Sequence, residues 1–202
     1  MPLPDFTSPQ TFPPFSALPF ASSSAQEQPL NQPYYLLAQI TQNMTLTKPT
    51  LILTDSTSAS FALVFDSRPG AGPETLDLKG MGLKPGSTLV LEGAKKGLPP
   101  SASPEDGKQG HVVVSREEEG RVKAIPAGRE KVVKVGEWLR KRDGEGKKRG
   151  CESCGREEEQ GLKRCTGCGE VEYCSKECQV KGWNDGHKAD CKVIKALRAI
   201  WP

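Results

Sequence analysis

Seven cysteines and one of the two histidines of this 202-residue chain lie between residues 151 and 191. They form four pairs: C-x2-C at Cys151 and Cys154, C-x2-C at Cys165 and Cys168, C-x3-C at Cys174 and Cys178, and H-x3-C at His187 and Cys191. A structural zinc ion takes four such sulfur or nitrogen ligands in a closed tetrahedron. The eight ligands therefore predict two zinc ions as cofactors.

The spacing within each pair has a physical reason. A C-x2-C pair fits a tight turn that directs both sulfurs to one point, and residues four apart lie on one face of a helix. A disulfide framework is disfavoured, because seven cysteines leave one unpaired and no secretory signal precedes them. A catalytic zinc is also disfavoured, because it would need an open coordination position, whereas here the protein can supply all four ligands of each ion. The spacing alone leaves open whether the two ions take sequential or interleaved pairs.

The order of these residues resembles the MYND-type zinc finger. The residues that carry the resemblance are Cys151, Cys154, Cys165, Cys168, Tyr173, Cys174, Ser175, Cys178, Gln179, Trp183, His187 and Cys191. A RING finger would place a histidine in the middle of the series, and a HIT-type finger brings its histidine sooner after the sixth cysteine. The interval from Trp183 to His187 is one residue longer than the commonest MYND spacing, at residues 184–186.

The resemblance implies a small α+β cross-brace fold at 151–191 with interleaved ligation. One zinc would bind Cys151, Cys154, Cys174 and Cys178, and the other Cys165, Cys168, His187 and Cys191. It also implies a protein-interaction module for proline-containing segments of partner proteins. The peptide would lie along residues 171–173 and contact Tyr173, Gln179 and Trp183, although Trp183 has an alternative role as a core residue that braces the zinc helices.

The chain is not expected to be an enzyme. MYND fingers occur in SET-type lysine methyltransferases, but the sequence contains no recognisable cofactor-binding motif, P-loop, paired carboxylates or Ser-His-Asp signature. The resemblance instead indicates an adaptor, with transcriptional regulation as one setting. Thiolate ligands without an export signal indicate the nucleus or the cytoplasm. No apolar run is long enough for a membrane span.

The sequence outside the finger predicts four further regions. Residues 1–33 are rich in Pro, Ser and Phe and predict a disordered tail. The alternative is a docking segment, because the tail contains several phenylalanines and 1–4 resembles the proline–leucine peptides that some MYND fingers bind. Residues 34–138 predict a mainly β domain, 139–150 a basic linker and 192–202 a helical extension of the finger.

The β domain is expected to be a small barrel or sandwich, similar in pattern to an OB-fold. Short runs rich in Val, Ile, Leu, Thr and Phe predict strands at 34–41, 50–54, 61–65, 88–92, 111–115, 121–125 and 131–135. An OB-like barrel next to a basic linker would give an alternative function in nucleic-acid binding. The candidate strands contain few basic or aromatic residues, however, and the alternation places Phe61 and Phe65 in the core.

Overall fold

The computed structural model describes residues 3–21, 33–66, 76–97, 110–144, 150–157 and 161–202. The chain divides into two compact units: Thr7–Arg129, and Met1–Phe6 together with Glu130–Pro202. The chain therefore passes from one unit to the other twice, after Phe6 and after Arg129. No helix in the described ranges is both long and apolar enough to cross a membrane.

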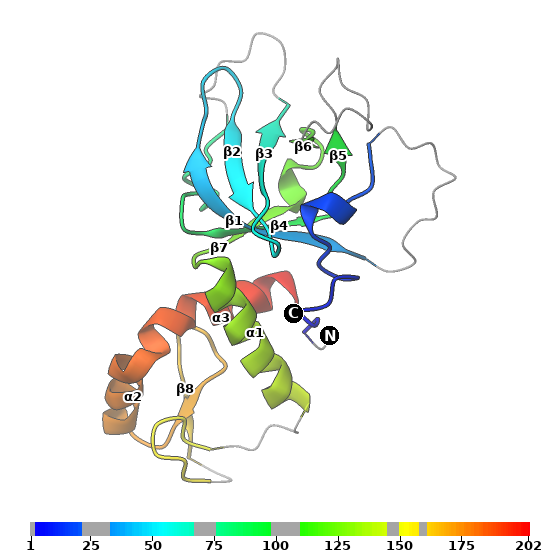
Figure 1. Ribbon diagram of the computed structural model, residues 1–202. Coiled ribbons are helices and arrows are strands. Elements are labelled where there is room, and N and C mark those ends of the chain that lie inside the picture. Colours follow the sequence, from blue (N-terminus) through cyan, green and yellow to red (C-terminus); the bar gives the residue numbers. More distant parts are fainter. Residues whose placement is uncertain (1–2, 22–32, 67–75, 98–109, 145–149, 158–160) are drawn as a thin grey trace. The chain divides into compact units, whose positions relative to one another are not determined.

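The first unit is built on one seven-stranded sheet (Figure 1). Its strands follow the order β5-β6-β3-β2-β1-β4-β7, and every pairing is antiparallel except that of β3 with β6. The two ends of this order, β5 and β7, do not pair in the described part of the chain, so the sheet is not a closed barrel. The strands are β1 (Tyr35–Asn43), β2 (Thr50–Thr54), β3 (Ser60–Phe65), β4 (Thr88–Glu92), β5 (Lys96–Gly97), β6 (His111–Val114) and β7 (Val122–Ile125).

Alternating side chains place the core on one face of the sheet. In β2 and β3 every second residue is buried, as expected for strands with one covered face. Phe61 and Phe65 belong to this core, as the alternation predicted. They are therefore not available to stack on nucleic-acid bases.

The expectation of a disordered tail is wrong for residues 3–21, of which Leu3, Phe6, Phe12, Phe15 and Leu18 are buried. Phe15 and Leu18 are buried in the core of the sheet, and the ring of Phe15 stacks on that of Phe61 at a centroid distance of 4.2 Å. The Phe15 N–H donates a 2.7 Å hydrogen bond to the buried carboxylate of Asp55. Phe15 is the first residue of a short 3-10 helix, η1 (Phe15–Ala17). The remainder of the predicted tail at 22–32 lies outside the described residues.

The predicted strand at 131–135 is wrong, because these residues belong to helix α1 (Arg129–Gly144). Val132, Val135 and Leu139 are buried, and their spacing of three and four residues is that of a helix. The helix also includes 139–144, which the sequence indicated as linker; 145–149 are not described. The predicted boundary at residue 138 is thus replaced by one at Arg129.

The second unit contains α1 and the cysteine-rich segment. A two-stranded sheet, β8 (Lys163–Arg164) and β9 (Glu172–Tyr173), precedes helix α2 (Lys176–Gly182), the π-helical turn η5 (Trp183–His187) and helix α3 (Lys188–Ile200). Ser175 caps α2, since its hydroxyl accepts a hydrogen bond from the Cys178 N–H. Val193, Ile194 and Leu197 form the buried stripe of α3.

Candidate metal centres

The first ligand group contains Cys151, Cys154, Cys174 and Cys178, whose sulfurs all lie within 4.8 Å of one another. Cys151 and Cys154 lie on a tight turn that is closed by a 2.8 Å hydrogen bond from the Gly155 N–H to the Cys151 carbonyl. Gly155 has a φ of 69°, which glycine adopts without steric cost. The first turn of α2 then brings Cys178 within 3.5 Å of Cys174.

The second group contains Cys165, Cys168, His187 and Cys191. Its turn repeats that of the first group, with a 2.8 Å hydrogen bond from the Gly169 N–H to the Cys165 carbonyl. The Cys165 sulfur lies 3.8 Å from that of Cys191, and the Cys168 sulfur lies 3.7 Å from Nε2 of His187. The two groups are therefore interleaved along the chain, as the resemblance implied.

The distances within both groups fit tetrahedral zinc. With a zinc–sulfur bond of about 2.3 Å, the edge of the tetrahedron is about 3.8 Å. The measured sulfur–sulfur separations of 3.5, 3.7 and 3.8 Å match this edge. A disulfide would bring two sulfurs to about 2.05 Å, and all seven cysteines are free. The two donor sets, one of four cysteines and one of three cysteines with a histidine, thus fit two zinc ions.

The electrostatics favour one thiolate in each group. Burial pushes the pKa of Cys151 up, but hydrogen bonds from the backbone N–H groups of Cys174 and Cys154 outweigh burial and lower this pKa to about 6. Burial also opposes ionisation of Cys165, whereas a hydrogen bond with the His187 ring helps to lower its pKa to about 6. Zinc requires deprotonated cysteine ligands, and the lowered pKa values favour this form of Cys151 and Cys165.

Cys174 and Cys191 hold their protons more tightly. Hydrogen bonding to Cys178 raises the pKa of Cys174 to about 12, and burial together with Cys165 raises that of Cys191 to about 12. Zinc binding must displace these protons, so metal uptake releases protons.

The π-helical turn explains the longer interval before His187. A π turn holds one more residue than the corresponding α-helical turn. Here it spans Trp183–His187, and Gly186 absorbs the distortion with a φ of 142°. The buried His187 ring still reaches Cys168. The additional residue therefore changes the path between α2 and α3 without removing a ligand.

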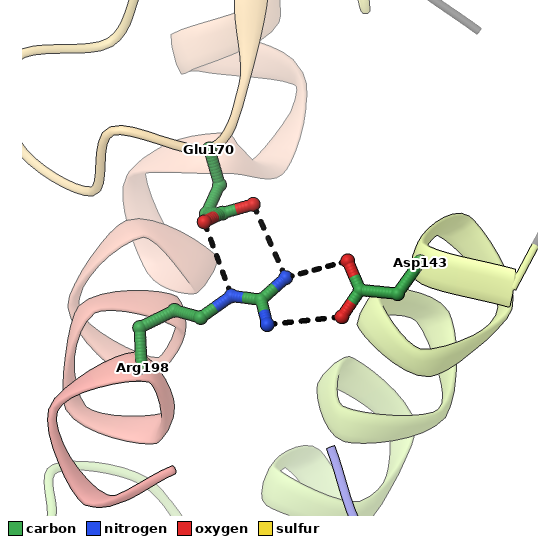
Figure 2. Close-up of polar contacts among 3 residues, drawn as sticks. All are labelled: Asp143, Glu170 and Arg198. Carbon is green, nitrogen blue, oxygen red and sulfur yellow. Dashed lines mark hydrogen bonds and ion pairs between the residues drawn. The ribbon is translucent and has the colours of Figure 1, made fainter. Parts of the chain in front are cut away.

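Arg198 was not singled out by the sequence analysis, although it organises the polar contacts around the second group. Figure 2 shows its guanidinium between Asp143 of α1 and Glu170 of the segment before β9. Nη1 and Nη2 donate to the two Asp143 carboxylate oxygens at 2.9 and 2.8 Å, and Nη2 donates to Glu170 at 3.3 Å. These carboxylates raise the pKa of Arg198. The sequence signal that could have indicated this role is the position of Arg198, a charged residue directly after Leu197 in the apolar stripe of α3.

The three residues that the resemblance implied for peptide binding differ in exposure. Tyr173 has 1% of its surface exposed, and its ring centroid lies 6.1 Å from that of His187. A peptide therefore cannot contact the Tyr173 side chain, which corrects the expected role of this residue. Gln179 is half-buried, and Trp183 is 38% exposed beside the exposed Val180.

A cavity of ≈ 330 Å³ lies between α1 and the metal-binding segment. Its walls include Val135, Trp138, Val171 and Ile194, together with Ser153 and Gly186. Neither Gln179 nor Trp183 lines this cavity. Gly182 and the metal ligand His187 do line it, so the cavity adjoins the second metal centre and the turn that carries Trp183.

Comparison with known proteins identifies the metal-binding segment. The MYND finger family model matches residues 151–191. A 54-residue stretch is 41% identical to the human histone-lysine N-methyltransferase SMYD3, and a 41-residue stretch is 46% identical to a SET and MYND domain-containing protein of Dictyostelium discoideum. These stretches cover 26% and 20% of this chain but only 12% and 7% of the two relatives. The similarity thus concerns a small part of each relative.

Proposed function

We propose, from the premise that residues 151–191 form a MYND-type zinc finger, that this chain is a non-enzymatic adaptor that binds proline-containing segments of partner proteins. MYND fingers are protein-interaction domains. The nucleus or the cytoplasm is the proposed location, and transcriptional regulation is a proposed setting. The observation that carries the proposal is an exposed aromatic surface held next to the second metal centre.

This surface consists of Gln179, Val180 and Trp183. Gln179 and Trp183 are four residues apart across the end of α2, so they lie on the same side of the helix. Trp183 is 38% and Val180 53% exposed, which leaves an exposed apolar area. Proline-rich segments dock against aromatic side chains, and a glutamine amide can form hydrogen bonds with the peptide backbone.

The metal ligand His187 supports the Trp183 ring. The two ring centroids lie 5.8 Å apart in an edge-to-face arrangement, which is favourable for an aromatic pair. Zinc at the second centre would therefore fix the orientation of His187 and, through it, the position of Trp183. Peptide binding is expected to depend on the metal for this reason.

A structural role for the zinc ions supports a non-enzymatic function. Each donor group supplies four protein ligands, and a zinc ion with four protein ligands has no position left for water or substrate. The aligned part of the SMYD3 relative is 12% of its length, so its methyltransferase activity is not carried over to this chain.

The test is the binding of an array of short proline- and leucine-containing peptides to the zinc-loaded full chain and to Trp183→Ala. We expect Trp183→Ala to bind the selected peptide at least about tenfold more weakly, as for an aromatic hot spot. Lys181→Ala, an exposed position in the same helix, is the matched control and should bind normally. Metal analysis must return two zinc ions for both variants.

Two results would contradict the proposal. Equal peptide binding by Trp183→Ala and the unchanged chain would exclude the aromatic surface as the site. Loss of zinc from Trp183→Ala would instead assign this residue to the core of the finger. A salt-dependent complex with single-stranded oligonucleotides, in the absence of peptide binding, would favour the nucleic-acid alternative.

A further inference from the structure

Residues 3–6 pack within the finger unit although they lie more than 120 residues before it in sequence. Leu3 and Phe6 are 3% and 1% exposed. Residues 3–5 form no regular secondary structure, and Pro4 lies between the two buried side chains. This short segment is therefore held by its side chains rather than by a sheet or helix of its own.

A glycine in the middle of α1 makes room for Phe6. A Cβ atom at Gly136 would lie 2.5 Å from Cε2 of the Phe6 ring, which is closer than real Cβ contacts allow. Glycine is unfavourable inside a helix, so its presence at this buried position is consistent with a need for this close approach. The Phe6 ring also packs edge-to-face against Trp201 at a centroid distance of 5.2 Å.

A charged contact accompanies the apolar ones. The carboxylate of Asp5 lies 4.0 Å from the guanidinium of Arg140, one turn of α1 beyond Gly136. Both side chains are about half exposed, with 43% and 50% of their surface accessible. This pair contributes little affinity, but it favours one direction of the segment along the helix.

We propose that Gly136 and Trp201 form the centre of a docking site for short peptides of the form Leu-x-x-Phe, and that residues 3–6 occupy this site in cis. Two apolar anchors three residues apart on an irregular segment are typical of peptides that bind in grooves. This site involves α1 and Trp201, whereas the proposed proline-peptide surface involves Gln179 and Trp183. The inference therefore does not depend on the proposed function.

The site has support that is independent of its occupant. Asp143 of α1 is bound to Arg198 of α3 by two hydrogen bonds of 2.8 and 2.9 Å, and Lys131 of α1 forms an ion pair with Asp190. These contacts hold α1 against α3 without residues 3–6. We therefore expect the site to persist, and to become accessible, when the segment is removed.

The experiment is peptide complementation with a variant that lacks residues 1–6. A labelled peptide of sequence Met-Pro-Leu-Pro-Asp-Phe is titrated into the zinc-loaded variant and followed by fluorescence anisotropy. We expect saturable binding with one peptide per chain. The full chain should show no binding at the same concentrations, because its own segment fills the site.

Two matched changes test the geometry. A peptide with alanine in place of Phe6 should bind at least about 100-fold more weakly, because the buried ring supplies most of the contact. Gly136→Ala, introduced into the shortened chain, should block the unaltered peptide while two zinc ions remain bound. The proposal would be overturned if the alanine peptide bound the shortened chain as tightly as the unaltered peptide does. It would also be overturned if the shortened chain with Gly136→Ala bound the unaltered peptide as tightly as the shortened chain without this substitution.

Three further results would also overturn it. The first is the absence of peptide binding to a shortened chain that retains two zinc ions. The second is loss of zinc from both the shortened chain and full-length Phe6→Ala, because residues 3–6 would then be an inseparable part of the core. The third is peptide binding to the unaltered full chain with equal affinity, which would place the peptide at a different surface.

Discussion

The guanidinium of Arg198 joins three parts of the finger unit, and its removal should destabilise that unit strongly. Besides its bonds to Asp143, its Nε lies 3.1 Å from the Glu170 carboxylate (Figure 2). The three side chains are 19%, 19% and 15% exposed. In Arg198→Ala the two carboxylates would remain close together, largely removed from water and without a cation.

The magnitude follows from the number and the burial of these contacts. Breaking a fully buried ion pair by removing one partner costs about 3–5 kcal/mol. Exposure of nearly one fifth reduces this cost through solvent screening, so we expect Arg198→Ala to lower the free energy of unfolding by about 3 kcal/mol. Arg198→Lys retains the charge but cannot contact both carboxylates with a planar fork, and it should lose about half of that amount.

Urea unfolding at saturating zinc, followed by far-UV circular dichroism, measures both changes. Lys195→Ala is the control, because Lys195 is an exposed residue of the same helix. It should change the free energy of unfolding by less than about 0.5 kcal/mol. An Arg198→Ala variant as stable as this control would refute the reasoning, since the three-residue contact would then contribute nothing measurable.

Three further outcomes follow from the metal centres and from the buried carboxylate of the sheet unit. Cys154 is exposed, whereas most of the second group is buried, so a chelator should remove the zinc of the first group sooner. For the same reason Cys154→Ser should retain one zinc ion. Zinc release is followed with a metal indicator, and a single release phase would contradict this prediction. Zinc affinity should fall as the pH decreases, most steeply below about 6, where protons compete for Cys151 and Cys165; competition titrations from pH 8 to 5 measure this. Burial raises the pKa of Asp55, but hydrogen bonds from the Phe15, Thr57 and Ala59 N–H groups and from the Thr57 hydroxyl outweigh burial and lower it. The stability that is present above the usual carboxyl pKa should therefore be lost as the pH falls through the depressed value. Acid unfolding of Asp55→Ala should lack this loss.

The zinc ligands were predictable because the signal is local. Each pair lies within five residues, and the spacing alone fixes a turn or one face of a helix. Which two pairs bind the same ion is not a local property of the sequence. It depends on how β8, β9 and the π turn bring distant pairs together. Spacing left this point open, and only the family resemblance implied the interleaved grouping that the structure contains.

The strands of the first unit were predictable for a similar reason, but their order was not. Alternating burial in β2 and β3 is visible in the sequence, whereas the parallel pairing of β3 with β6 joins segments that are far apart in the chain. The valines of α1 favoured a strand by their β-branched side chains. Their contacts within the second unit, rather than their intrinsic preference, determine the helix.

The N-terminal segment shows how composition can mislead. A proline-rich stretch has few backbone hydrogen bonds of its own, and composition therefore indicates disorder. Here Phe15 is held by Asp55, forty residues away, and Phe6 is held by Gly136 and Trp201. Each anchor is a contact with a distant residue, and a count of residue types carries no information about such contacts.

The folded unit extends beyond the residues that match the MYND family model, and the difference has a physical reason. A segment of about forty residues buries too little apolar surface to fold without metal, so the ligand pattern that defines the family ends at Cys191. In this chain the apolar face of α3 continues beyond that residue, and Val193 and Leu197 are fully buried. Zinc therefore accounts for the local path of the finger, whereas α1, Arg198 and residues 3–6 complete a core that the ligand pattern does not encode.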